Sequence, residues 1–371
     1  MLAGSYFANS TLTIQHSKLL ENTAFLRLLT DFSPEIRNFV LHIFKSLKES
    51  LKPDIDIIII SYNCAQLTLA CIESVFKTHE TARVTIVDNA STDNSPHVIR
   101  EKFPEIQIIE NKENRGYAGA VNIGMNATNA EFAIISNADV EFFENSIDIL
   151  KNVLKENLRI GAAGPQQVFP NGKWQRSFGD PPGIGEAIRE IFMLPYVFYS
   201  FKKLTWKRAP GSLKSFKKIS FKNVRYIDGA VIAVRRDAFK DVGAFDEDFF
   251  FYAEEADFCL RLQKKKWEVV TVSDSVVLHH RGGSSTKSEV NEKFYTLLIE
   301  SKMKLARKHY PQFAKLYAQL EIFHSNQMIF LSKFLKAVTL GRFKSRAEKV
   351  FTIQKAAFKK ELKASGFKKG F

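Results

Sequence analysis

Between residues 55 and 156 the chain alternates short apolar runs with segments in which apolar residues recur at helical spacing. The run 55–60 is apolar except for Asp56, a pattern typical of a strand that is covered on both faces. Similar runs occupy residues 84–87, 106–109 and 132–135, and helical spacing marks residues 65–78, 95–103, 117–127 and 145–156. This alternation predicts an α/β fold with a mostly parallel central sheet and helices on both faces.

The regular alternation ends after Pro165. Residues 166–223 are rich in Pro and Gly, and a basic insertion covers about 183–225. Strand patterns return at 230–234, 269–272 and 276–278, and helical patterns at 254–265, 287–308 and 312–336. We therefore predict three parts: a helical N-terminal extension (1–50), an α/β domain (51–286) and a helical, basic C-terminal extension (287–371).

Composition and charge restrict the possible locations and partners. No apolar run approaches the roughly 18 residues of a membrane span, and the N-terminus carries no signal-peptide pattern. Three cysteines, none in a Cys-x-x-Cys pair, fit a reducing cytoplasm and argue against a zinc site or a disulfide framework. The net charge of +14 is concentrated in residues 202–225, with nine Lys/Arg and no acid, and residues 331–371, with twelve Lys/Arg and two acids.

These basic segments favour an anionic partner such as a phospholipid surface or a lipid pyrophosphate. Nucleic acid is favoured by charge alone, because no recognition motif is present. Residues 344–364 form an amphipathic pattern with lysines on one side. That pattern fits binding at an anionic membrane surface, and it fits equally a helix packed on the body with its lysines in solvent.

Polar side chains follow three of the predicted strands, at the sheet edge where α/β proteins bind ligands. Ser61-Tyr62-Asn63 follows the first strand, and its Tyr and Asn can contact a base or ribose. Asp88 ends the second strand and can accept from a pyrimidine N–H. The fourth ends in Asn137-Ala138-Asp139, and our hypothesis is that Asp139 holds a divalent metal on a bound diphosphate. Polar turns would give similar patterns, and neither a dinucleotide fingerprint nor a Walker loop occurs.

Four later stretches add candidate chemistry. Asn114-Arg115-Gly116 opens a helix rich in small residues, where backbone can approach phosphate closely and Arg115 can neutralise it; tight packing is the alternative reading. Asp228-Gly229 can line a sugar pocket or form a structural turn. Residues 245–261 combine six carboxylates with aromatic residues, which favours a general base at Glu254 or Glu255. His279 or His280 can complete a metal site with Asp139.

Within the acidic stretch, Asp257 and Arg261 are four residues apart on the predicted helix. At that spacing the two side chains lie on one face. We therefore predict a structural ion pair between them.

Taken in order, these motifs resemble the family 2 glycosyltransferases of the GT-A fold. The motifs are Ser-Tyr-Asn, Val-Asp-Asn-Ala-Ser-Thr-Asp, Asn-Arg-Gly-Tyr-Ala-Gly, Asn-Ala-Asp, Phe-Phe-Tyr-x-Glu-Glu-x-Asp-x-x-x-Arg and His-x-x-Gly. Within that family they are most similar to the rhamnosyltransferase-like branch. The resemblance covers about residues 54–286, so residues 51–286 would be a GT-A domain.

The resemblance implies roles for individual residues. Tyr62 and Asp88 would contact the nucleotide base, and Asn114 with Arg115 the diphosphate. Asn137 and Asp139 occupy the family's Asp-x-Asp positions, so Asp139 would be the metal-binding carboxylate and Asn137 could bond the ribose. Glu255 stands where the family has its catalytic base, normally Asp, and His279 where it has a further metal ligand.

From this we predict an inverting, metal-dependent glycosyltransferase with Mg²⁺ or Mn²⁺ as cofactor. The donor would be a dTDP- or UDP-sugar, with rhamnose as the candidate sugar, and the acceptor a surface glycan or a lipid-linked glycan reached from the cytoplasmic face of the membrane. Two alternatives are an enzyme acting on a soluble acceptor and a catalytically inactive GT-A-like module recruited to membranes.

Overall fold

The computed structural model describes residues 55–79, 82–192, 220–250, 252–280, 291–338 and 347–364. The chain divides into two compact units, residues 1–54 and 55–371, and every described residue belongs to the second. The predicted N-terminal extension and most of the basic insertion lie outside the described residues.

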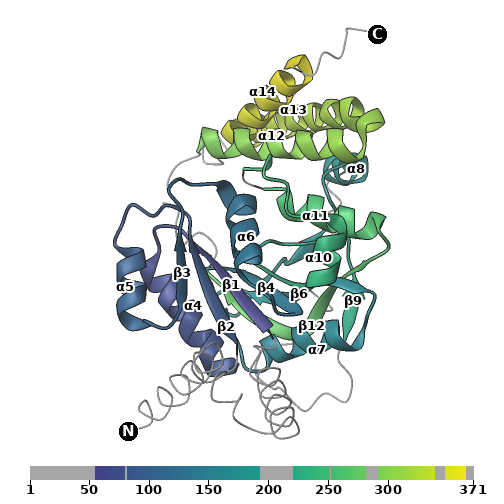
Figure 1. Ribbon diagram of the computed structural model, residues 1–371. Helices are drawn as coiled ribbons and strands as arrows, with labels where there is room; N and C mark the ends of the chain where they lie inside the picture. Colours follow the sequence, from purple (N-terminus) through teal and green to yellow (C-terminus); the bar gives the residue numbers. More distant parts are fainter. Residues whose placement is uncertain are drawn as a thin grey trace, which may run out of the picture. The chain divides into compact units, whose positions relative to one another are not determined.

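Within the described residues, ten strands form one mixed sheet whose main path runs β3-β2-β1-β4-β11-β6-β12-β5 (Figure 1). The neighbours from β3 to β4 are parallel, as are β6 and β12, whereas β11 and β5 run antiparallel to their neighbours. The main-path strands are β1 (Ile55–Ser61), β2 (Arg83–Asp88), β3 (Gln107–Glu110), β4 (Phe132–Asn137), β5 (Val140–Phe142), β6 (Ile160–Val168), β11 (Val231–Arg235) and β12 (Glu268–His279). The shorter strands are β7 (Trp174–Gln175) beside β6, β9 (Phe221–Asn223) beside β12, and a separate pair, β8 (Phe178–Gly179) and β10 (Tyr226–Ile227).

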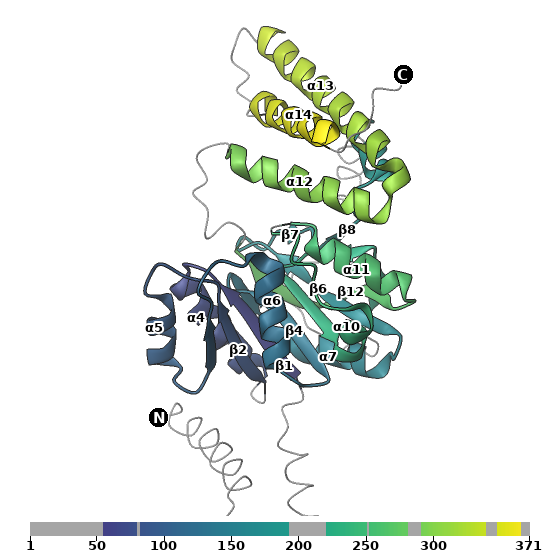
Figure 2. The ribbon, with the colours of Figure 1, turned by 45° about the horizontal axis from the view of Figure 1, so that its top comes forward.

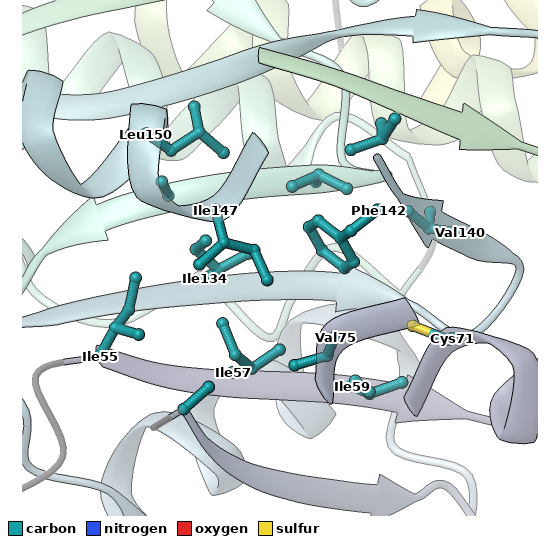
Figure 3. Close-up of a cluster of buried hydrophobic side chains, with 14 of the residues drawn as sticks. Ile55, Ile57, Ile59, Cys71, Val75, Ile134, Val140, Phe142, Ile147 and Leu150 are labelled. Atoms are coloured by element: carbon teal, nitrogen blue, oxygen red, sulfur yellow. The ribbon is translucent and has the colours of Figure 1, made fainter. Parts of the chain in front are cut away.

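Helices cover both faces of the sheet, as predicted. The α/β part contains α4 (Ala65–Thr78), α5 (Ser95–Lys102), α6 (Gly116–Ala127), α7 (Ser146–Glu156), α8 (Ile184–Ile191), α10 (Arg236–Val242) and α11 (Glu254–Lys264). Alternate side chains of β1 enter different cores. Ile57 and Ile59 pack with residues of α4 and α7, as Figure 3 shows, whereas Ile58 packs with α6 and α11. Burial on both faces explains why the strand sequence is almost continuously apolar.

The sequence analysis did not predict β5 and β6, and two further features of the sheet differ from the sequence pattern. The strand patterns at 269–272 and 276–278 belong to one strand, β12, with a register shift between Val272 and Val276. The strand predicted at 230–234 is β11, and it runs against both of its neighbours. A strand that is fully buried has the same apolar pattern in either direction, so its sequence alone does not give its orientation.

The C-terminal segment is helical, as predicted, and its helices share a core with α8. The 3-10 turn η2 (Pro311–Phe313) separates α12 (Glu292–His309) from α13 (Ala314–Val338), and α14 (Ala347–Ala364) follows. Figure 2 shows the three helices together, and Tyr317 of α13 meets Phe358 of α14 edge to face. Phe358 is buried there, so part of the apolar face of residues 344–364 is used for packing on the protein. Among the described residues, none of the helices is both long enough and apolar enough to cross a membrane.

Candidate active site

The register of the sheet brings three of the predicted polar stretches to one edge. Ser61 lies opposite Asp88 across β1 and β2, and Ile60 lies opposite Asn137 across β1 and β4. Because these strands are parallel, Tyr62, Asp88 and Asp139 all lie at or just beyond the carboxyl ends of their strands. The sequence prediction of a common edge is therefore confirmed.

Asp139 and His279 lie together at that edge. Oδ1 of Asp139 is 3.4 Å from Nε2 of His279. The antiparallel pairing of β5 with β12 places His279 opposite Val140, and the backbone N–H of His280 donates to the carbonyl of Asp139. The second histidine, His280, is instead 2.6 Å from Glu141, so His279 is the imidazole that faces Asp139.

Two buried glutamines orient the imidazole of His279. Its Nδ1 lies 3.1 Å from Oε1 of Gln167 and 2.9 Å from the side-chain amide of Gln175, and these glutamines are neighbours across β6 and β7. Oε1 of Gln167 accepts a hydrogen bond when Nδ1 carries the proton, whereas Nε2 of Gln175 donates one when Nδ1 does not. In the Nδ1–H tautomer the lone pair of Nε2 is directed toward Asp139, the arrangement expected of a metal-binding histidine.

Residues of the loop after β2 form hydrogen bonds with two of the candidate base-binding residues, Asp88 and Asn63. Asp88 is 2% exposed, and its carboxylate accepts from both the N–H and the hydroxyl of Ser91. Asn63 has a positive φ of 50° and accepts from the N–H of Thr92, whereas Tyr62 is exposed. The hydroxyl of Ser61 is buried against Thr68. Tyr62 and Asn63 are thus the exposed side chains of this group, and Asn63 is partly engaged by the loop.

Asn89 organises the loop that contains Asn114, Arg115 and Gly116. Its amide donates to Oδ1 of Asn114 and to the carbonyl of Gly116, and its oxygen accepts from the N–H of Arg115. The guanidinium of Arg115 pairs with Glu247 at 3.0 Å, where both side chains are exposed. The loop is therefore held through its backbone, and the Arg115 side chain rests on the acidic stretch.

Gly116 is required by geometry at the point where this loop meets the acidic stretch. It has a φ of +69°, and a Cβ built on it would lie 2.4 Å from the carbonyl oxygen of Phe250. The N–H of the next residue, Tyr117, donates to that same carbonyl. Two motifs that are more than 130 residues apart in sequence thus touch through backbone atoms.

Asp228 and Gly229 connect the acidic stretch to the Asp139 edge. The carbonyl of Ala230 accepts from the N–H of Asn137, and the hydroxyl of Tyr117 donates to the carbonyl of Gly229 at 2.6 Å. A Cβ built on Gly229 would lie 3.8 Å from the carboxyl carbon of Glu255. Glu255 therefore lies beside Gly229, and the residue after Gly229 is hydrogen-bonded to the end of β4, two residues before Asp139.

The two glutamates at the start of α11 are in surroundings that favour the protonated carboxyl. Burial, followed by the charge of Asp228, raises the pKa of Glu255 to about 8. Burial, followed by the charge of Glu255, raises the pKa of Glu254 well above its usual value, and Oε2 of Glu254 has no hydrogen-bond partner among the described residues. The pair thus provides a proton-accepting group that titrates near neutrality.

The predicted ion pair next to these glutamates is confirmed. Nε of Arg261 lies 2.8 Å from Oδ2 of Asp257. The buried Asp257 also pairs with His309 at 2.7 Å and with Lys308 at 2.8 Å. Asp257 therefore has a structural role, and it joins α11 to α12.

Comparison with known proteins identifies the family. A family model described as glycosyl transferase family 2 matches residues 56–243, about half of the chain, and one described as glycosyl transferase family group 2 matches residues 189–338. An N-acetylglucosaminyl-diphospho-decaprenol L-rhamnosyltransferase of Mycobacterium tuberculosis is 30% identical over 222 residues, which are 56% of this chain and 69% of that protein. The chain belongs to the family 2 glycosyl transferases. It is a member of their rhamnosyltransferase-like branch.

Other similar proteins share the glycosyltransferase character. The low-salt glycan biosynthesis hexosyltransferase Agl10 of Haloferax volcanii is 22% identical over 256 residues, 67% of this chain and 74% of that protein. Among solved structures, a mannosyltransferase of Pyrobaculum calidifontis in complex with GDP-Man and Mn²⁺ has a TM-score of 0.52 at 16% identity, over 86% of this chain and 88% of that one. A structure of GalNAc-T7 with UDP, GalNAc and Mn²⁺ has a TM-score of 0.50 at 14% identity. The match covers 85% of this chain and 57% of that one. The predicted GT-A fold is confirmed.

Several residues that support the site of this glycosyltransferase were not found by sequence reasoning. Asn89, Gln167, Gln175 and Tyr117 act through contacts with residues far away in the chain. Asn89 directly follows the candidate Asp88, which was a usable signal. Gln167 lies in β6 and Gln175 in the two-residue strand β7. Their spacing in the sequence does not indicate a functional role.

Proposed function

We propose that this glycosyltransferase transfers a sugar, rhamnose or another hexose, from a dTDP- or UDP-sugar to an acceptor hydroxyl with inversion at the anomeric carbon. The observation that carries the proposal is the arrangement of Asp139 with His279 at one strand edge, and of Glu255 beside Gly229 at the same edge. A metal-binding pair and a proton acceptor are the two groups that such a reaction requires.

The residues around Asp139 suit a divalent metal. One carboxylate oxygen and one imidazole nitrogen with its lone pair free are a donor set for Mg²⁺ or Mn²⁺, with further positions left for diphosphate oxygens and water. When bound, such an ion neutralises the negative charge that develops on the departing nucleoside diphosphate. Asp139 and His279 would hold it, and Gln167 would keep His279 in the required tautomer.

Glu255 is proposed as the general base. In its carboxylate form it accepts the proton of the acceptor hydroxyl while that oxygen forms a bond to the anomeric carbon. The bond from that carbon to the diphosphate breaks, and the nucleoside diphosphate leaves with the electron pair. Attack from the face opposite the leaving group inverts the anomeric configuration.

The remaining predicted residues are proposed to bind the donor. Tyr62, Asn63 and Asp88 would contact the base, and Ser61 would support them; Asn137 would contact the ribose; Asp228, Gly229 and Glu254 would line the sugar pocket. Arg115, with the backbone of Asn114 and Gly116, would contact the diphosphate. An exposed ion pair such as Arg115–Glu247 contributes about 0–1 kcal/mol, so Arg115 can exchange Glu247 for a phosphate at little cost.

A lipid-linked glycan is the proposed acceptor, and the enzyme would reach it at the cytoplasmic membrane surface. The relative from Mycobacterium tuberculosis is named for a diphospho-decaprenol acceptor, which is a lipid pyrophosphate. On α13, exposed apolar side chains recur on one side, at Leu316, Phe323, Phe330, Phe334 and Val338. The same end of α13 carries two exposed lysines, Lys333, which lies 3.8 Å from Glu348, and Lys336. An apolar ridge with neighbouring lysines suits the interface of an anionic membrane.

A nucleotide-sugar assay tests the proposal. Purified protein would be incubated with dTDP- and UDP-sugars and Mn²⁺, and release of the nucleoside diphosphate would be followed with and without EDTA. We expect metal-dependent turnover that Asp139→Asn abolishes and that Glu255→Gln lowers about 10²–10⁴-fold without loss of nucleotide binding. Nucleotide binding without turnover of any donor would instead favour an inactive GT-A-like module, and equal turnover in Glu255→Gln would exclude Glu255 as the base.

A further inference from the structure

Helix α12 contacts the acidic stretch on both sides of Glu254 and Glu255. Nζ of Lys308, near the end of α12, lies 2.6 Å from Oδ2 of Asp246 and 2.8 Å from Oδ1 of Asp257. One ammonium therefore pairs with two carboxylates, one that precedes the two glutamates in the sequence and one that follows them. Such a contact fixes the stretch at both ends with respect to α12.

The second of these carboxylates, Asp257, is buried in the first turn of α11. Nε2–H of His309 donates to its Oδ1 at 2.7 Å, and Arg261 donates to its Oδ2 at 2.8 Å. Burial by itself would raise the pKa of Asp257. Hydrogen bonds from His309 and Lys308 outweigh burial, and the pKa lies well below its usual value. Asp257 is therefore charged at every pH at which Glu255 titrates.

Apolar contacts hold the same stretch against α12. Leu305 of α12 is buried in one cluster with Phe249 and Ala253. Phe294, in the first turn of α12, meets the ring of Tyr252 edge to face, with the ring centroids 5.3 Å apart. The helix thus supports the acidic stretch from its first turn to its last, through apolar and charged groups.

The backbone directly before the two glutamates has a conformation that needs such support. Tyr252 and Ala253 each have a φ of 70°. A positive φ is unfavourable for a residue with a Cβ, and it persists where surrounding contacts impose it. Because Ala253 is the N-cap of α11, its conformation determines the direction in which Glu254 and Glu255 leave the loop. Contacts with α12 lie on both sides of this point in the sequence.

We propose that Lys308 and His309 are positioning residues for the general base, which hold the start of α11 through Asp257 so that the carboxylate of Glu255 faces the acceptor hydroxyl. This inference rests on the proposed role of Glu255. A general base must lie within hydrogen-bond reach of the proton it accepts, and a displacement of about 1 Å can lower the rate about 100-fold. The candidate nucleotide-binding residues follow other strands, so loss of this support should lower kcat far more than nucleotide affinity.

Turnover by Lys308→Met tests this role. Methionine removes the ammonium and keeps most of the side-chain length. Nucleoside diphosphate release would be measured with Mn²⁺ and with the dTDP- and UDP-sugars of the assay above. We expect kcat to fall about tenfold while KM for the nucleotide-sugar stays nearly unchanged. Lys308→Arg, which can still pair with both carboxylates, should restore most of the lost kcat.

Arg307→Met is the matched control. Arg307 directly precedes Lys308 on α12, and the two side chains are 35% and 36% exposed. Arg307 pairs at 2.7 Å with Glu361 of α14, so its substitution removes an ion pair that leads away from the acidic stretch. We expect a lower melting temperature with wild-type kcat. An equal fall of kcat in both variants would show a general effect of stability and would overturn the positioning role.

The Glu255→Gln protein separates this inference from the proposed base. Adding Lys308→Met to it should lower kcat no further, because the group to be positioned is already lost. Wild-type kcat in Lys308→Met, with reduced kcat in Glu255→Gln, would overturn the positioning role alone. Wild-type kcat in Glu255→Gln would overturn both proposals. If Lys308→Met fails to fold, Phe294→Leu, at a half-buried position beside Tyr252, replaces it with the same expected results.

Discussion

Glu255 and Glu254 are the residues whose ionisation is most affected by the fold. Both lie at the start of α11, where a helix N-terminus favours a negative charge, yet burial raises both pKa values, followed by the charge of Asp228 for Glu255 and the charge of Glu255 for Glu254. Burial therefore outweighs the effect of the helix terminus. The sequence showed the acids and the aromatic residues around them, but it could not show which acid lies beside Asp228 and Gly229.

This raised pKa predicts how stability depends on pH. Between the ordinary value of 4.5 and the folded value of about 8 for Glu255, the folded state binds more protons than the unfolded state. The free energy of unfolding therefore falls as pH rises through this range. In urea titrations from pH 5 to 8 we expect a smaller fall for Glu255→Gln than for the wild type. Glu105→Gln, at an exposed site, should behave as the wild type; equal pH dependence in all three proteins would contradict the assignment.

At Gly116 the backbone conformation determines which residue type fits. Gly116→Ala would place a side chain at positive φ and would also force the loop away from the carbonyl of Phe250. Gly172 has a similar φ of +72° with nothing within 4 Å, so Gly172→Ala measures the backbone effect alone. We expect a loss of about 1 kcal/mol for Gly172→Ala, and for Gly116→Ala a larger loss together with weaker nucleotide binding. Calorimetry and denaturant titration would measure both; equal losses would show that the contact with Phe250 is unimportant.

At the scale of elements, the site depends on which strands are neighbours. Asp139 meets His279 because β5 runs antiparallel to β12, and His279 is oriented because β7 folds back onto β6. Apart from β5, the order of strands and helices up to α7 followed from the sequence, since apolar periodicity is a local property. The long-range pairings of β5, β7 and β11 did not, because short or fully buried strands carry no signal of partner or direction.

The β6–β7 pairing gives a prediction about metal affinity. Gln167→Ala removes the acceptor that fixes Nδ1–H of His279, so we expect Mn²⁺ affinity to fall about 10–100-fold. Gln263→Ala, which removes an amide bonded to the backbone carbonyls of residues 224 and 225, is the control and should retain affinity. Mn²⁺ titration followed by electron paramagnetic resonance would measure the change. Unaltered affinity in Gln167→Ala would mean that Gln167 is not needed to orient His279.

On the scale of the whole molecule, the C-terminal helices are integrated with the α/β part. Lys308 and His309 of α12 reach Asp257 of α11, the helix that carries Glu255. The sequence predicted a basic helical extension, but it could not distinguish lysines at the surface from those that pair with buried acids. Removal of residues beyond 330 would cut α13, delete Phe358 and so expose Tyr317, and point substitutions therefore test membrane binding more cleanly than truncation.

Membrane binding is expected to depend on the ridge of α13. Phe330 and Phe334 are 72% and 54% exposed, and inserting one such side chain into an interface contributes about 1.5–3 kcal/mol. We expect Phe330→Ser with Phe334→Ser to reduce binding to vesicles containing phosphatidylglycerol at least tenfold. The control Leu158→Ser, at a 74% exposed leucine beyond α7, should have no effect. Sedimentation with vesicles would decide, and equal binding by both variants would exclude α13 as the docking surface.

The central claim is that Asp139, His279 and Glu255 serve one reaction at one sheet edge. The most direct measurement is a crystal structure with Mn²⁺ and a nucleoside diphosphate, UDP or dTDP, using the anomalous signal of the metal. We predict a Mn²⁺ peak between Oδ1 of Asp139 and Nε2 of His279, with the diphosphate bound to it and Glu255 facing its outer phosphate. A nucleotide bound at another edge, or Mn²⁺ absent from the Asp139–His279 pair while the diphosphate is bound, would contradict the account.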